Sequence, residues 1–175
     1  NDFLEGGEGD DVLFGHEGDD SLLGGEGNDT LAGWNGDDTI KGGGGDDTLH
    51  GQHGDDQLTG GAGNDHIEGG AGNDSMMAGA GNDIVYGGQG QDLLLGGDGR
   101  DLLAGSEGDD QLLGEGGNDM IYGQTGADFI DGGEGDDWLV GGAGADFIDG
   151  GEGFDHVSYQ DESESVSINL SNQTE

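Results

Sequence analysis

Aspartate recurs at a fixed spacing of nine residues along most of the 175-residue chain. From Asp11 onward, each of these aspartates stands two residues after a glycine and two residues before a large apolar residue. Carboxylates beside backbone carbonyls that no side chain shields are the oxygen ligands of hard divalent cations. The periodic aspartates are Asp2, Asp11, Asp20, Asp29, Asp38, Asp47, Asp56, Asp65, Asp74, Asp83, Asp92, Asp101, Asp110, Asp119, Asp128, Asp137, Asp146 and Asp155.

These aspartates occupy position six of a nonapeptide unit, G-G-x-G-x-D-x-U-x, in which U is a large apolar residue. Read from Gly6, the unit recurs seventeen times without a slip and ends at Ser158, after a partial repeat over residues 1–5. A fixed period of this kind is the signature of a repeat architecture. Position four is always glycine: Gly9, Gly18, Gly27, Gly36, Gly45, Gly54, Gly63, Gly72, Gly81, Gly90, Gly99, Gly108, Gly117, Gly126, Gly135, Gly144 and Gly153.

The unit predicts short strands joined by turns. Helix is disfavoured because each glycine costs about 1 kcal/mol relative to alanine in a helix. The segment G-G-x-G-x-D is typical of turns, and the remaining x-U-x is long enough for a three-residue strand with U facing inward. Two units then form one coil with strands on opposite sides. We therefore predict an all-β fold, a parallel β-roll (a two-sheet right-handed β-solenoid) of about 17 nonapeptide repeats.

The period also sets the expected domain organisation. Residues 1–158 are expected to form the array, and residues 159–175, where glycine disappears, a C-terminal capping strand or tail. Val166, Ile168 and Leu170 alternate there with polar residues, which predicts one half-buried strand over the last coil. Because the chain opens in mid-repeat and without methionine, we expect it to be part of a longer protein.

The charge balance excludes several partners. Formal charge is −39, from 41 acidic residues against two basic ones, Lys41 and Arg100. No basic patch can neutralise phosphates, so we expect no nucleic acid partner, and an anionic membrane surface is disfavoured for the same reason. No apolar run approaches the roughly 18 residues of a membrane span. The absence of cysteine excludes disulfide bonds.

Stacked coils would bring the aspartates of every second repeat close together, and like charges at such separations need a counterion. Ca²⁺ fits best, because it takes six to eight oxygens; Mg²⁺ demands a small octahedron, and Zn²⁺ prefers Cys or clustered His. One ion between each repeat and its second neighbour gives up to about fifteen Ca²⁺, whose charge of roughly +30 offsets most of the −39. We predict that the array stays unfolded until Ca²⁺ binds.

The segment Gly60–Glu68 and its sixteen sister units resemble the nonapeptide of the repeat-in-toxin (RTX) family, the hemolysin-type calcium-binding repeats. The resemblance implies a parallel β-roll, secretion in the unfolded state by a type I system, and folding on extracellular Ca²⁺. It also implies that the metal ligands are the carboxylates of the periodic aspartates and the carbonyls of the preceding turn residues, including the position-four glycines. The expected location is extracellular, either secreted or at the cell surface.

Two roles remain open for such a module. One is a structural or adhesive scaffold, as in a surface layer or an adhesin. The other is the non-catalytic secretion and folding module of an extracellular enzyme such as a protease, lipase or polysaccharide epimerase. Neighbours such as Asp19 and Asp20 could suggest two-carboxylate acid–base chemistry, but a ligand with a solvated neighbour, repeated by the period, explains them. We expect no catalytic residue in this chain.

Some units depart from the consensus. Ala78 replaces glycine at position one, and position five is Asn or Asp with five exceptions: Gln91, Arg100, Ala127, Ala145 and Phe154. We interpret position five as solvated and not a ligand. Side chains at position two should leave the sites intact, because only carbonyls would bind the ion there. Position two carries His16, Trp34, Gln52, Ser106, Glu115 and Gln124 instead of glycine.

Outward positions seven and nine are unusually apolar in the C-terminal half of one predicted sheet. Four adjacent strands of such residues exceed the few hundred Å² usual for a solvated patch, which predicts a protein contact surface that shields Trp138. The alternative is the β-propensity of aromatic and branched residues. The residues of this face are Ile84, Tyr86, Leu102, Ala104, Met120, Tyr122, Trp138 and Val140, and the opposite sheet adds Leu93, Leu95, Leu113, Phe129 and Phe147.

Overall fold

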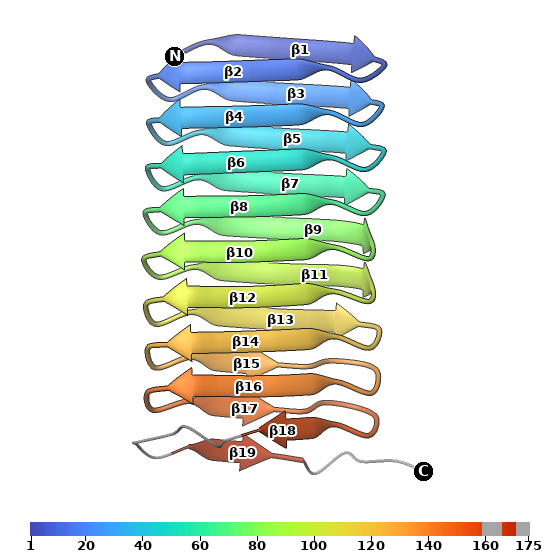
Figure 1. Cartoon of the computed structure of the whole chain (residues 1–175), viewed down its shortest axis with the longest axis vertical. Coiled ribbons are helices and arrows are strands. Elements are labelled where there is room, and N and C mark those ends of the chain that lie inside the picture. Colours follow the sequence, from blue (N-terminus) through green and yellow to red (C-terminus); the bar gives the residue numbers. More distant parts are fainter. Residues whose placement is uncertain (159–165, 171–175) are drawn as a thin grey trace.

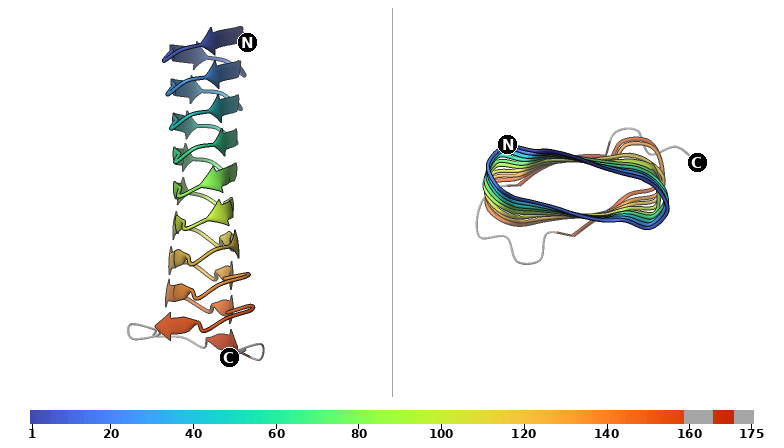
Figure 2. Two further views of the ribbon diagram at one scale, coloured as in Figure 1. Left: turned by 90° about the vertical axis from the view of Figure 1, so that its right-hand side faces the viewer. Right: turned by 90° about the horizontal axis from the view of Figure 1, so that it is seen from above.

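The computed structural model describes residues 1–158 and 166–170. All regular structure in these residues is β-strand, and none of them belongs to a helix that could cross a membrane. The strands stack along one axis in two parallel sheets, and the chain changes sheet at every turn (Figure 1). Viewed from above, the coils superimpose as a flattened ring (Figure 2). The all-β, two-sheet β-solenoid prediction is confirmed.

One sheet has ten strands, and each strand pairs with the next odd-numbered one. Its strands are β1 (Phe3–Glu8), β3 (Ser21–Glu26), β5 (Thr39–Gly44), β7 (Gln57–Ala62), β9 (Ser75–Gly81), β11 (Leu93–Gly99), β13 (Gln111–Gly116), β15 (Phe129–Asp131), β17 (Phe147–Asp149) and β19 (Ser167–Asn169).

The other sheet has nine strands, all even-numbered. They are β2 (Val12–Glu17), β4 (Thr30–Asn35), β6 (Thr48–His53), β8 (His66–Ala71), β10 (Ile84–Gln89), β12 (Leu102–Glu107), β14 (Met120–Thr125), β16 (Trp138–Ala143) and β18 (His156–Ser158). Within the array, paired residues are 18 positions apart, as with His50 and Glu68, so equivalent side chains form columns along the axis.

The core consists of the position-eight side chains of β2 to β17, together with Ala78 at position one of its unit. Leu49, Ile67 and Val85 stack in one column of the nine-stranded sheet and have no exposed surface. Every position-eight residue from Leu22 to Ile148 is at most 1% exposed. Burial of each such side chain contributes about 2 kcal/mol, so the register follows directly from the apolar period.

The strands are longer than the sequence pattern predicts. Most contain six residues, because positions one to three of the next unit continue the ladder. In β6, for example, Gln52 pairs with Gly70 beyond the expected triplet that ends at His50. The three-residue prediction holds only for the short strands β15, β17, β18 and β19. The turn proper is therefore the triplet at positions four to six.

Position two requires a backbone conformation that favours glycine. Gly61 has φ 122° and Gly70 has φ 119° there, and the non-glycine residues of the described chain with positive φ all occupy position two. Such a residue is strained by about 1–2 kcal/mol relative to glycine. The residues concerned are His16 (77°), Trp34 (85°), Gln52 (81°), Ser106 (88°), Glu115 (72°) and Gln124 (79°).

The C-terminal strand β19 pairs with β17 and places Ile168 beside Ile148. Val166 packs against the core, while Ile168 at the end of the stack is 40% exposed. This strand lies where the alternation of apolar residues predicts one. Residues 159–165 and 171–175 of the predicted tail lie outside the described residues.

The outward columns that the sequence predicts are present on the nine-stranded sheet. Ile84, Leu102, Met120 and Trp138 are in register across β10, β12, β14 and β16. Ile84 is 39% and Trp138 43% exposed, although the Trp138 ring lies only 4.0 Å from the His156 ring. Ala104 departs from the expectation: it is 3% exposed, although it lies in the outward column between Tyr86 and Tyr122.

Candidate metal sites

The periodic aspartates lie where each turn enters a strand, and their carboxylates point into the coil. The fifteen from Asp20 to Asp146 are buried, with exposures of 1–4%. Asp11 and Asp155, near the ends, are half-buried, and Asp2 is exposed. Charged residues are almost never fully buried without a partner, so this repeated burial marks a functional arrangement.

One oxygen of each buried carboxylate belongs to a hydrogen-bond ladder. The backbone N–H of Asp47 donates to Asp65 Oδ1 at 2.8 Å, and the N–H of Asp65 donates to Asp83 Oδ1 at 2.7 Å. The same step of 18 residues repeats along both edges of the solenoid. One ladder runs from Asp11 to Asp155 and the other from Asp2 to Asp146. By holding Oδ1, the ladders also fix the direction in which the other oxygen of each carboxylate, Oδ2, points.

That second oxygen, Oδ2, is buried and has no hydrogen-bond partner. An unsatisfied buried polar atom costs about 1–3 kcal/mol, and more when it is charged. Sixteen such atoms in two columns cannot be explained as isolated defects. They belong to Asp11, Asp20, Asp29, Asp38, Asp47, Asp56, Asp65, Asp74, Asp83, Asp92, Asp101, Asp110, Asp119, Asp128, Asp137 and Asp146.

The glycine at position one leaves open the space beside Oδ2. A Cβ atom built on Gly96 would lie 2.6 Å from Asp101 Oδ2 and 2.8 Å from the carbonyl oxygen of Gly114. Gly96 does not have positive φ, so it is needed for space and not for backbone conformation. A carboxylate oxygen and a carbonyl oxygen thus flank a gap that any side chain would fill. The sequence pattern did not separate this role from that of position two, although glycine occupies position one in every unit except that of Ala78.

The position-four glycines form the tip of each turn, with positive φ throughout, for example 132° at Gly63. The N–H of Gly63 donates to the carbonyl of Ala80 at 2.9 Å. No turn hydrogen bond of the described residues ends on the carbonyl oxygen of a position-four glycine. The carbonyl that was predicted as a ligand therefore keeps its lone pairs available.

Burial also raises the pKa of the mid-array carboxyls, from Asp38 to Asp137. Loss of hydration is the main cause; the hydrogen bond from the neighbouring backbone opposes it, and the adjacent aspartates of the column add to it. The pKa of Asp74, Asp119 and Asp128 rises to about 7 from 3.8. The pKa of Asp65 and Asp101 rises to about 6. At neutral pH these carboxyls are therefore partly ionised, and burying their charge opposes folding of the metal-free chain.

The donor set identifies the class of ion that fits. Within the described residues, no three His, Asp or Glu side chains converge on one point, so a site needs backbone carbonyls as well as carboxylates. All of these donors are oxygens, and none is sulfur or imidazole. A hard dication with flexible, oxygen-rich coordination matches such a set, and Ca²⁺ matches it better than Mg²⁺ or Zn²⁺.

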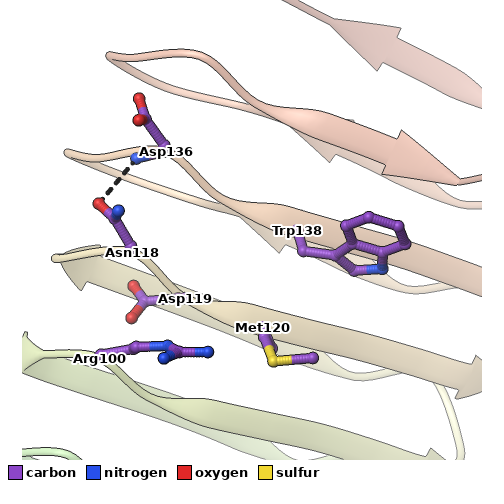
Figure 3. A pocket seen from close by; sticks show the side chains of 6 residues that line it. All are labelled: Arg100, Asn118, Asp119, Met120, Asp136 and Trp138. Atoms are coloured by element: carbon purple, nitrogen blue, oxygen red, sulfur yellow. Dashed lines mark hydrogen bonds between the residues drawn. The ribbon is translucent and has the colours of Figure 1, made fainter.

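A second ladder lies outside the first, at position five. Asp136 donates its backbone N–H to Asn118 Oδ1 at 3.0 Å, and Asn82 donates to Asn64 Oδ1 at 2.9 Å (Figure 3 shows the former). Position five is exposed, as expected, but the sequence interpretation missed these bonds. The preference for Asn and Asp was their signal, because both offer a short side-chain acceptor. Arg100 interrupts the ladder because its side chain cannot accept.

No curated relative matches the sequence. A family model described as the RTX calcium-binding nonapeptide repeat (4 copies) matches residues 1–31, 33–67, 59–94, 95–130 and 122–157. These matches cover nearly the whole array, with the same period that sets the carboxylate columns. The chain therefore belongs to the family of RTX calcium-binding nonapeptide repeats.

Proposed function

We propose that this chain is a calcium-dependent folding module that serves as a non-catalytic scaffold in a secreted or cell-surface bacterial protein. The observation that carries the proposal is the pair of columns of buried Oδ2 atoms without partners. Without a cation, stacking the coils leaves those oxygens desolvated and mutually repulsive. With Ca²⁺, the same oxygens become ligands, so binding and folding are one equilibrium.

In the proposed sites, each ion is held by position-six carboxylates and by turn carbonyls on one edge of the solenoid. The ligands are those predicted from the sequence, the aspartates from Asp2 to Asp155 and the glycines from Gly9 to Gly153, with the strongest sites between Asp20 and Asp146, where burial is complete. The position-one carbonyls are additional donors, because they line the same gap as Oδ2. Two edges of this length accommodate up to about fifteen ions if one ion lies between neighbouring coils.

The same equilibrium supports an extracellular location. Calcium sites of extracellular modules have dissociation constants of about 10⁻⁴–10⁻³ M, far weaker than those of cytosolic buffers. A chain of charge −39 would stay expanded at low Ca²⁺ and would fold at high Ca²⁺. This difference is suited to transport of the unfolded chain by a type I system, followed by folding outside the cell.

A scaffold role is favoured over an enzyme role by the regularity of the columns. From Asp29 to Asp146 the buried aspartates share one environment from coil to coil, each with an Oδ2 that has no partner, whereas catalysis requires a carboxylate with its own distinct surroundings. Asp20 differs only in that its Oδ1 also lies 3.3 Å from the N-terminal amine of Asn1. The outward apolar residues of β10, β12, β14 and β16 would provide the contact surface of such a scaffold.

Circular dichroism during a Ca²⁺ titration tests the proposal, with Mg²⁺ as the control. We expect a cooperative gain of sheet signal with Ca²⁺, its loss on adding chelator, and little response to Mg²⁺. Metal analysis of the folded chain should find many ions per chain. Full sheet content in excess chelator at neutral pH would refute the proposal.

A further inference from the structure

Three of the chain's five histidines lie together on the outer face of the nine-stranded sheet. His50 and His53 are on β6, and His66 is on the adjacent strand β8, two residues before Glu68. Residues two apart on a strand face the same side of the sheet, so His66 and Glu68 both point outward, and both are exposed. The register places His50 directly opposite Glu68.

The side chains of this cluster are already close. His50 Nδ1 lies 3.2 Å from Glu68 Oε2, and the rings of His50 and His66 are 6.4 Å apart between centroids, at 76°. Beside them is a hollow of about 370 Å³ lined by His50, Gln52, His53 and Glu68. Gly69 and Gly70 also line it, and their lack of side chains keeps it open.

We propose that His50, His66 and Glu68 bind one zinc-class divalent cation, separate from the calcium positions in the turns. Two imidazoles and a carboxylate are suitable ligands for Zn²⁺, which completes its tetrahedron with water in three-ligand sites. Ca²⁺ and Mg²⁺ prefer sites made wholly of oxygen ligands, so two imidazoles beside one carboxylate favour Zn²⁺ over them. The strongly negative field of the chain raises the local concentration of any dication.

Binding requires one local movement. As the side chains stand, no three His, Asp or Glu side chains of the described chain are placed so that they could hold a metal ion. His66 packs edge-on against Tyr86, with centroids 5.8 Å apart. Exposed side chains exchange rotamers within nanoseconds, and rotation of the His66 ring towards His50 would close the site. The neighbouring Asp65 is not involved, because its carboxylate is buried on the inner side.

The test is a Zn²⁺ titration by calorimetry in excess Ca²⁺, so that the oxygen sites are filled, with Co²⁺ absorption as a second probe of imidazole ligation. We expect one Zn²⁺ per chain and a Co²⁺ spectrum of low coordination number that Zn²⁺ abolishes. His50→Ala and His66→Ala should each weaken binding at least tenfold, and Glu68→Gln should weaken it less. The side chains point outward, so Ca²⁺-induced sheet content should not change in these variants.

His156→Ala is the matched control, because His156 lies on the same sheet but packs against Trp138 far along the array. It should bind Zn²⁺ like the unaltered chain. The proposal is overturned if the folded chain takes up no Zn²⁺ in excess Ca²⁺. It is equally overturned if the His50→Ala/His66→Ala double variant binds as tightly as the His156→Ala control. Because folding is followed separately, failure of the calcium proposal would be seen as absent sheet signal.

Discussion

Replacing one mid-array aspartate by asparagine isolates the role of Oδ2. Asp101→Asn keeps the side-chain volume and keeps an Oδ1 that accepts the backbone N–H of Asp83, now at 2.8 Å. Only Oδ2, the atom without a partner, and its share of the charge are changed. Any loss of stability in Ca²⁺ is therefore the loss of a metal ligand and not of a ladder hydrogen bond.

The size of the effect follows from linkage. An ion present at about 100 times its dissociation constant stabilises the folded state by about 2.7 kcal/mol, and Asp101→Asn should remove at least one ion. We therefore expect the free energy of unfolding in Ca²⁺ to fall by about 3 kcal/mol. At limiting Ca²⁺ the fall should vanish or reverse, because the variant then lacks only a carboxylate whose pKa burial raises to about 6 and whose ionisation at neutral pH opposes folding.

Urea unfolding followed by circular dichroism measures this difference, together with the number of ions bound. Asp98→Asn is the matched control, since it makes the same change in the same repeat at an exposed position. Exposed substitutions of this kind usually change stability by less than about 0.5 kcal/mol. The reasoning fails if Asp101→Asn and Asp98→Asn have equal stability and equal ion content in excess Ca²⁺.

Three further outcomes are expected. Gly96→Ala, whose Cβ would collide with Asp101 Oδ2 and Gly114 O, should destabilise the Ca²⁺ form by about 1–3 kcal/mol. Gly116→Ala is the control: its Cβ would meet nothing nearer than 3.8 Å, so it should be neutral or slightly stabilising. Equal urea midpoints for the two variants would show that the space beside Oδ2 is not needed. Burial raises the folded-state pKa of Asp65 to about 6 and that of Asp74 to about 7, so these carboxyls favour the metal-free fold at low pH and lose that contribution as pH rises through 6 and 7. In chelator the sheet signal should grow as pH falls through this range, while Ca²⁺ affinity should weaken. A flat profile would show that the carboxylates are not buried as described. Ala127→Asn should stabilise the array by about 0.5–1 kcal/mol in urea unfolding, because its side chain would give the Ala145 N–H the acceptor that Asp109 gives Ala127 at 2.8 Å, and a loss of stability would exclude a role for the outer ladder.

The period alone predicts most of the fold. Because position eight is always apolar, Leu49 and Ile67 must lie side by side in neighbouring coils, and the coil length and the two sheets follow from this pairing. What the pattern could not predict is where each strand ends. Gln52 and His53 stand at positions with the local preference of a turn, yet they extend β6, because coils stacked in register pair them with Gly70 and Ala71. Such long-range pairing overrides local propensity.

For the candidate sites, too, the sequence predicts the ligands but not the separate roles of the residues around them. The sequence identifies Asp101 as a ligand by its period, but it treats the two glycines of each unit as one kind of residue. In the structure they differ: Gly97 needs its positive φ of 110°, whereas Gly96 needs only the absence of a side chain. Position two therefore tolerates residues such as Gln52 at the cost of strain, while a side chain at position one fills the space beside Oδ2. Ala78 is the exception that tests this distinction. Its methyl group stands at position one, where the other units leave space beside Oδ2, so the site at Asp83 should be the weakest of its column.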